Sequence, residues 1–147
     1  MEPDFRALQV LAEVSLGIVG FSAILIGLSR SKKGFSKPDN FRIQLLTFSA
    51  FGAMFCALLP FAIFNQNNID LSWAIVNWTL CLYSTIGLLI FPRRVFDLRR
   101  EGYKDLFPFK IIALQVGILI TIFILSGSMI LGLIEQKNNF YIFCLML

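Results

Sequence analysis

The chain has 147 residues, of which 57% are hydrophobic and only 15% are charged. This balance, with a mean hydropathy of +0.77, excludes a soluble globular domain as the main body of the protein. The net charge of +4 does not indicate a nucleic-acid partner, because the positive residues lie in connections beside apolar segments.

Four apolar blocks follow one another along the chain, at residues 7–28, 43–64, 71–91 and 111–134. Each is long enough for a helix that crosses a bilayer, which takes about 20 residues. None alternates as a strand would, and backbone groups in lipid must find their hydrogen bonds within the segment. The sequence therefore predicts an all-α polytopic transmembrane helical bundle that forms a single domain over 1–147.

The two ends of the chain differ in character. The start, Met1-Glu2-Pro3-Asp4, is acidic and no small-residue cleavage site follows the first apolar block, so residues 7–28 are expected to stay as a helix. The end re-enters an apolar run at 140–147. Eight helical residues cover about 12 Å, less than half of the hydrocarbon core. We expect a truncated fifth span, with a short interfacial tail as the alternative.

Positive charge gathers in two connections. Eleven of the 13 Lys and Arg residues lie within 29–42 and 92–110, and the other two are Arg6 and Lys137. Because cytoplasmic loops concentrate Lys and Arg, these two loops are expected to be cytoplasmic and the N-terminus to lie outside. A bacterial inner membrane is the expected location.

The connection 92–110 is long enough for structure of its own. Pro92 can begin a helix and Gly102 can end one. Two interpretations stay open, a solvated helical connector and an interfacial basic helix that contacts anionic lipid head groups. The candidate head-group residues are Arg93, Arg94, Arg99 and Arg100.

Small residues mark the helix faces that can pack closely inside a bilayer. In the first block, Glu13, Gly17, Gly20 and Gly27 share one face at about 100° per residue, so Glu13 is expected to point toward another helix. Gly117 and Gly132 lie on the corresponding small-and-polar stripe of the fourth block, with Thr121 and Ser128.

Depth in the membrane suggests one polar layer. Glu13 is expected about 10 Å inside the outer edge, with Gln9 one turn before it. Asn77 and Ser128 come at similar depth, and Pro60 frees the carbonyl of Cys56 at that level. Three roles stay open for Glu13: a protonated structural clasp to Asn77, a proton- or substrate-coupled site, and a contact with a partner subunit.

The stretch LAEV (11–14) within the first apolar block resembles the small multidrug resistance transporters. In that family a glutamate of the first of four helices binds a proton or a cationic drug in exchange, so the resemblance implies that Glu13 is the coupling residue. It covers four residues, and the third block lacks the Gly-x-Ala-Tyr-Ala-x-Trp pattern of those transporters. More broadly, LAEVSLGIVGFSAI (11–24) and LLTFSAFGAMFCALLPF (45–61) resemble uncharacterised bacterial multi-pass membrane proteins.

These patterns favour a structural or interaction role, in which the protein associates through its small-residue helix faces. A proton-coupled transporter or channel-like element that uses Glu13 is the alternative. No enzyme is expected, because the chain has no histidine and no pair of carboxylates within the apolar blocks. Cys56, Cys81 and Cys144 lack metal or redox spacing, so no metal or other cofactor is expected, and the expected partners are the lipid bilayer and a second membrane chain.

Overall fold

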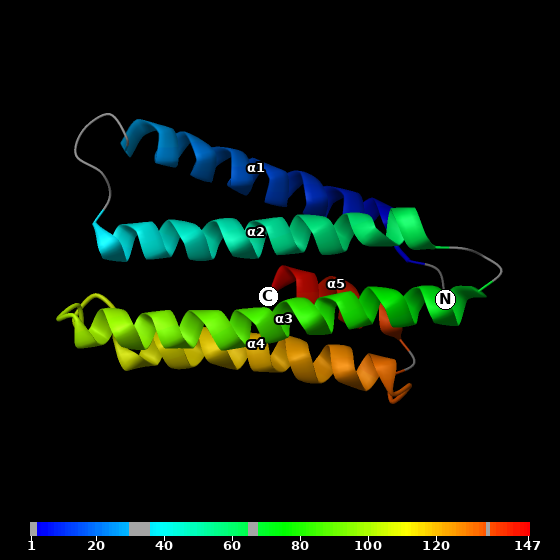
Figure 1. The fold of residues 1–147 in the computed structure, drawn as a ribbon. Helices are drawn as coiled ribbons and strands as arrows, with labels where there is room; N and C mark the ends of the chain where they lie inside the picture. The colour runs from blue at the N-terminus through cyan, green and yellow to red at the C-terminus, as the bar shows by residue number, and fades with distance from the viewer. Residues whose placement is uncertain (1–2, 30–35, 65–67, 135) are drawn as a thin grey trace.

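The computed structural model describes residues 3–29, 36–64, 68–134 and 136–147, and within them the regular structure is all α-helical, as predicted (Figure 1). The first four helices are long and apolar enough to cross a membrane. The chain is therefore a multi-pass integral membrane protein. The helices are α1 (Phe5–Ser29), α2 (Lys37–Ile63), α3 (Ile69–Arg100), α4 (Phe109–Ile130) and α5 (Lys137–Met146).

Polar flanking residues lengthen two helices beyond their apolar blocks. α2 begins at Lys37 rather than at residue 43, because the Ser36 hydroxyl caps it by accepting from the Asp39 N–H at 3.4 Å. α3 continues through Pro92 to Arg100, so the prediction that Pro92 begins a separate helix is wrong. At 1.5 Å per residue its 32 residues reach about 48 Å, well beyond the hydrocarbon core.

Glycines in the left-handed region end α3 and α4. Gly102 has a φ of 104°, and the Tyr103 N–H bonds back to the Leu98 carbonyl at 3.2 Å, which is a Schellman motif. The prediction that Gly102 ends a helix is confirmed. Gly132, with a φ of 72°, ends α4 in the same way, so this helix ends at Ile130 rather than at residue 134.

The long helices form two antiparallel hairpins. α1 packs chiefly against α2 and α3 chiefly against α4, and the hairpins meet mainly through α2 and α3. Figure 1 shows α1 and α4 on opposite sides of the molecule, with α5 between the hairpins and the C-terminus about halfway along the bundle. The end of α1, the start of α2, the end of α3 and the start of α4 lie at the same end of the bundle.

A stripe of mainly small residues joins α1 to α2. Leu8, Ala12, Ser15 and Ser22 are all buried, and their spacing of three, four or seven residues places them on one face of α1. The Phe5 ring packs on Phe61 of α2, with ring centres 4.9 Å apart. Small side chains let the two backbones approach closely, which is how helices associate in lipid.

Two buried clusters lie along the bundle axis. The first, near the N-terminus, joins α1, α2, α3, α4 and α5 and includes Leu8, Cys56, Trp73, Met129 and Tyr141. The second lies near the α3–α4 connection and comprises Phe41, Phe91, Val95, Phe107 and Ile112.

Candidate functional site

The predicted pair of Gln9 and Glu13 is present on α1 but faces outward. The Gln9 amide nitrogen donates to a Glu13 carboxylate oxygen at 2.9 Å, one turn along the helix, and both side chains are exposed. Glu13 lies about 12 Å along α1 from Phe5. This places an exposed carboxyl group within the candidate membrane span Phe5–Gly27.

The glycines of α1 share the face of Glu13, as predicted, but this face does not pack within the chain. Gly17, Gly20 and Gly27 are exposed, and a methyl group added at any of them would meet no described atom within 4 Å. The expectation that Glu13 points toward another helix of the chain is therefore wrong. The reason is that α1 has one principal neighbour, α2, which takes the opposite face. We call this surface the Glu13 stripe; it comprises Gln9, Glu13, Gly17, Gly20 and Gly27.

The stripe expected on α4 does not form a packed surface within the chain, because Gly117 faces outward and Gly132 ends the helix. Gly117 has no described atom within 4 Å of an added methyl group, and the partly buried Ser128 donates to the Ile124 carbonyl of its own helix at 2.8 Å. Gly132 is the residue that ends α4, so its assignment to helix packing is wrong. Like α1, α4 has one principal neighbour, which leaves this face free.

Asn77 is the one polar side chain of the predicted layer that is fully buried. Only 1% of its surface is exposed, and neither atom of its amide has a hydrogen-bond partner among the described residues. The structure therefore does not form the predicted clasp between Asn77 and Glu13. Glu13, Asn77 and Ser128 do not converge, because the first lies on the outer face of α1 and the second lies inside the bundle.

The carbonyl freed by Pro60 does find a partner, and it comes from α5. Pro60 has no N–H to offer the Cys56 carbonyl one turn earlier. The Tyr141 hydroxyl donates to this carbonyl at 2.6 Å, and both residues are fully buried. The prediction of a free carbonyl is thus consistent with the structure, whereas Tyr141 as its partner was not predicted.

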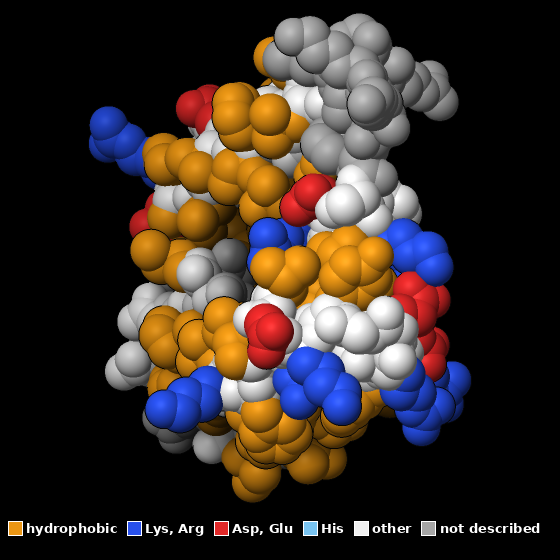
Figure 2. Space-filling model, turned by 90° about the vertical axis from the view of Figure 1, so that its left-hand side faces the viewer, with side chains coloured by type: hydrophobic (Ala, Val, Ile, Leu, Met, Phe, Trp, Pro, Cys, Tyr) orange, Lys and Arg blue, Asp and Glu red, His pale blue; other side chains and the backbone are white. Residues whose placement is uncertain are grey.

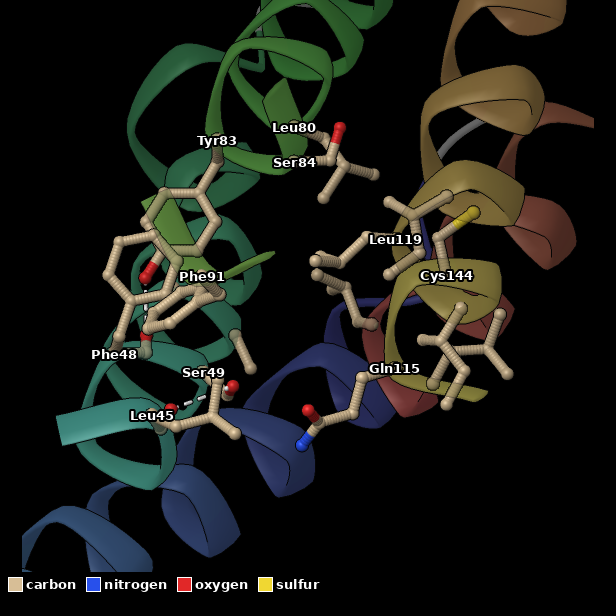
Figure 3. A pocket seen from close by; sticks show the side chains of 16 residues that line it. Leu45, Phe48, Ser49, Leu80, Tyr83, Ser84, Phe91, Gln115, Leu119 and Cys144 are labelled. Atoms are coloured by element: carbon tan, nitrogen blue, oxygen red, sulfur yellow. Dashed lines mark hydrogen bonds between the residues drawn. The ribbon is translucent and has the colours of Figure 1, made fainter. Parts of the chain in front are cut away.

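A cavity of about 300 Å³ lies between the two buried clusters, and we call it the central cavity. Its wall includes the stacked rings of Phe48 and Tyr83, whose centres are 4.3 Å apart, and the ring of Phe91. Figure 3 shows side chains from α2, α3, α4 and α5 around it. The lining residues are Leu45, Phe48, Ser49, Gly52, Ala53, Leu80, Tyr83, Ser84, Phe91, Gln115, Ile118, Leu119, Ile122, Cys144, Leu145 and Leu147.

Most polar groups in the wall are already bonded within the protein. Ser49 donates to the Leu45 carbonyl at 3.0 Å, Ser84 to the Cys81 carbonyl at 2.9 Å, and Tyr83 to the Phe48 carbonyl. The partly buried Gln115 amide has no such partner among the described residues. Sequence reasoning missed Gln115, although an amide within the fourth apolar block is a signal that could have identified it.

At the end of the bundle where α3 ends and α4 begins, Lys and Arg side chains are spread among apolar side chains, with Asp and Glu between them (Figure 2). Two of the predicted head-group residues are bound to the protein: Arg94 donates to the Gln44 side chain and Arg99 to the Phe107 carbonyl. Among the described residues, Arg93 and Arg100 have no hydrogen-bond or salt-bridge partner. A salt bridge of 2.8 Å between Lys37 and Glu101 joins α2 to α3 here. The other predicted loop charges Arg30, Lys32 and Lys33 lie outside the described residues.

Metal and family comparisons add no further site. Among the described residues, no group of three His, Cys, Asp or Glu side chains is placed to hold a metal ion. No family model, curated protein or solved structure matches the chain.

Proposed function

We propose that this integral membrane protein functions by associating with a second copy of itself through the Glu13 stripe. The observation that carries the proposal is the position of Glu13, a carboxyl group on a lipid-facing helix surface with Gln9 as its sole described hydrogen-bond partner. Polar groups in hydrocarbon are costly, and they normally face another helix or a water-filled cavity.

The spacing of the Glu13 stripe supports a helix partner. Positions 13, 17, 20 and 27 fit the alternating steps of four and three residues that form the seam of left-handed helix pairs. Three of these four positions are glycine, which allows two backbones to approach closely. α1 thus carries two seams on opposite faces, one packed against α2 and the other free.

A second copy fits this surface better than an apolar partner does. Two chains inserted in the same orientation place Gln9 and Glu13 of both copies at the same depth. A protonated Glu13 can then donate to the Glu13 carbonyl or the Gln9 amide oxygen of the other copy. A partner helix without a polar group at this level would leave the carboxyl group with only the hydrogen bond from Gln9 of its own helix.

We also propose that the basic end of the bundle faces the cytoplasm and that the membrane is a bacterial inner membrane. Described residues of this end include Lys37, Arg42, Lys104 and Lys110, with the four arginines of 93–100, whereas Arg6 and Lys137 lie at the other end. This distribution supports the orientation by the positive-inside rule.

Dimerisation in liposomes tests the association. The measurement is the dimer fraction of fluorescently labelled protein as its mole fraction in lipid is varied. Gly17→Leu with Gly20→Leu is expected to weaken dimerisation about tenfold, because the side chains separate the backbones. The added side chains project from the bundle into open space and leave the single chain intact. The matched control is Gly117→Leu on α4, which has the same open surroundings.

Two results would contradict the proposal: a wild-type chain that stays monomeric at every mole fraction, or equal losses for the α1 variant and Gly117→Leu. Glu13→Gln separates association from proton coupling, the alternative role for Glu13. The amide still forms hydrogen bonds, so dimerisation should persist, whereas proton-driven transport through this residue would stop.

A further inference from the structure

We infer that the central cavity binds a neutral, medium-chain amphiphile, a molecule with one hydroxyl or carbonyl group on an unbranched apolar tail. This inference does not rest on dimerisation, since the cavity lies inside one chain and the Glu13 stripe lies on its outer surface.

The shape of the cavity matches an unbranched tail. Its lining extends along α4 from Gln115 to Ile122 and along α2 from Leu45 to Ala53, which is about 10–12 Å at 1.5 Å per residue. Aromatic rings and aliphatic side chains provide most of the wall. A cavity of this size and character is typical of small-molecule sites, which are mainly apolar with a few placed polar groups.

One side-chain amide in the wall is available to a ligand, and it lies toward the basic end of the bundle. Gln115 comes six residues after the start of α4, about 9 Å along the helix. Figure 3 shows its side chain extending across the cavity toward Ser49. The hydroxyls of Ser49, Tyr83 and Ser84 already donate to backbone carbonyls and can only accept from a ligand, whereas the Gln115 amide can both donate to and accept from a ligand head group.

The charge of the wall selects a neutral head group. Its lining contains no Lys, Arg, Asp or Glu side chain. A carboxylate group would therefore lie among apolar side chains without a counter-charge, which is unfavourable. An alcohol, ester or ketone can bond to the amide without this cost. The expected pose has the head group at Gln115 and the tail directed to Leu80 and Ile122 near the middle of the bundle.

Photolabelling of the full chain in nanodiscs tests this site. The probe is a ten-carbon alcohol that carries a diazirine in its tail, and labelled residues are mapped by mass spectrometry. Saturable labelling of cavity residues such as Leu119 is expected, with 1-decanol and decane as competitors. Gln115→Leu should weaken the binding of 1-decanol about three- to tenfold, the range for one neutral hydrogen bond, and leave the binding of decane unchanged.

Two further variants complete the design. Ala53→Leu narrows the cavity and should weaken the binding of both 1-decanol and decane. This variant keeps the test valid if Gln115→Leu does not fold. Gln9→Leu is the matched control, since it removes an amide from the outer surface and should weaken neither.

Three results would overturn the inference. Labelling confined to outward residues such as Leu114 would show that the probe reports on bulk lipid. If decanoate competes as well as 1-decanol does, the cavity does not select a neutral head group. A bilayer lipid that stays bound and is not displaced by 1-decanol would show that the cavity holds a lipid acyl chain instead.

Discussion

Tyr141 and Pro60 show how one residue supplies the hydrogen bond that another removes. Pro60 leaves the Cys56 carbonyl without its helical partner, deep among apolar side chains. The Tyr141 hydroxyl replaces the missing N–H, and its ring packs against Trp73 of α3 at 5.8 Å between ring centres. A short helix, α5, is thereby bonded to α2 and packed on α3 by one side chain.

Tyr141→Phe is expected to lower the free energy of unfolding by about 1–2 kcal/mol, because the Cys56 carbonyl is then buried without a partner. In a Pro60→Ala background the same change should cost less, since the alanine backbone supplies the N–H that proline lacks. Denaturation of the four proteins in mixed micelles measures the coupling. Equal costs of Tyr141→Phe in both backgrounds would contradict this account.

Replacing Asn77, in contrast to Tyr141, is not expected to destabilise the protein. Its amide is buried and has no hydrogen-bond partner among the described residues, so it gains no bond to offset its desolvation. Asn77→Leu should therefore leave the stability unchanged or raise it by about 1 kcal/mol. The matched control is Asn138→Leu. The Asn138 side chain is also buried but accepts from the Asp4 N–H at 2.8 Å, so its loss should destabilise. A clear loss of stability in Asn77→Leu would contradict this expectation and show that the Asn77 amide does form a stabilising contact.

At the scale of the helices, the contact between α2 and α3 depends on Gly52. A methyl group at this position would lie 2.0 Å from a ring carbon of Tyr83, so no side chain fits unless the ring moves. The ring is held by its stacking on Phe48 and by its bond to the Phe48 carbonyl. The small residue on one helix and the large ring on the other are therefore complementary.

Gly52→Ala is expected to destabilise the protein by about 1–3 kcal/mol, the usual cost of overpacking. Tyr83→Leu in the same chain should recover part of this loss. Gly127→Ala, at a helical glycine with open surroundings, is the control and should be neutral or slightly stabilising. Unfolding in micelles measures all four proteins, and an unchanged stability in Gly52→Ala would show that Tyr83 moves freely.

The extension of α3 beyond Pro92 suggests a place for lipid head groups. Arg93 and Arg100 are exposed and seven residues apart, so they lie on one face of the helix with exposed Phe96. Arg94 and Arg99 are bound to Gln44 and to the Phe107 carbonyl. Substituting the first pair should therefore affect lipid binding, and substituting the second pair should affect stability.

We expect Arg93→Gln with Arg100→Gln to weaken the binding of anionic lipid by up to about thirtyfold, at about 1 kcal/mol for each basic residue near the surface. Arg94→Gln with Arg99→Gln removes the same charge and serves as the control. Native mass spectrometry with phosphatidylglycerol measures retention. Equal losses for the two pairs would mean that total charge, and not position, controls binding.

Hydropathy and turn residues predict the elements well but not their neighbours. The four spans, the helix end at Gly102 and the free Cys56 carbonyl can be derived from residue types and local geometry. A helical wheel also places Glu13 and the α1 glycines on one face correctly. It cannot tell whether that face meets another helix, since this depends on how many neighbours α1 has. The place of Gln115 in a cavity also depends on helix neighbours, because only the packing of α2, α3 and α4 forms a cavity beside it.

In the whole molecule, the hairpin arrangement gives the bundle one end that is richer in basic residues than the other. In Figure 1 the end of α1, the start of α2, the end of α3 and the start of α4 lie at one end of the bundle, and the start of α1 lies at the other. The described basic residues Lys37, Arg42, Lys104 and Lys110 are close in sequence to the first of these ends. Each of the four long helices runs in the opposite direction to the one before it.

Cysteine accessibility in intact spheroplasts tests that orientation. In a chain whose native Cys56, Cys81 and Cys144 are replaced by serine, Asn139→Cys lies near the start of α5 and should react with an impermeant maleimide from outside. Lys104→Cys, exposed in the α3–α4 connection, should react only after lysis, because basic loops stay in the cytoplasm. Labelling of both after lysis is the control for reactivity. Reaction of Lys104→Cys in intact spheroplasts, with Asn139→Cys protected, would show the opposite orientation, with the C-terminal end of α3 outside.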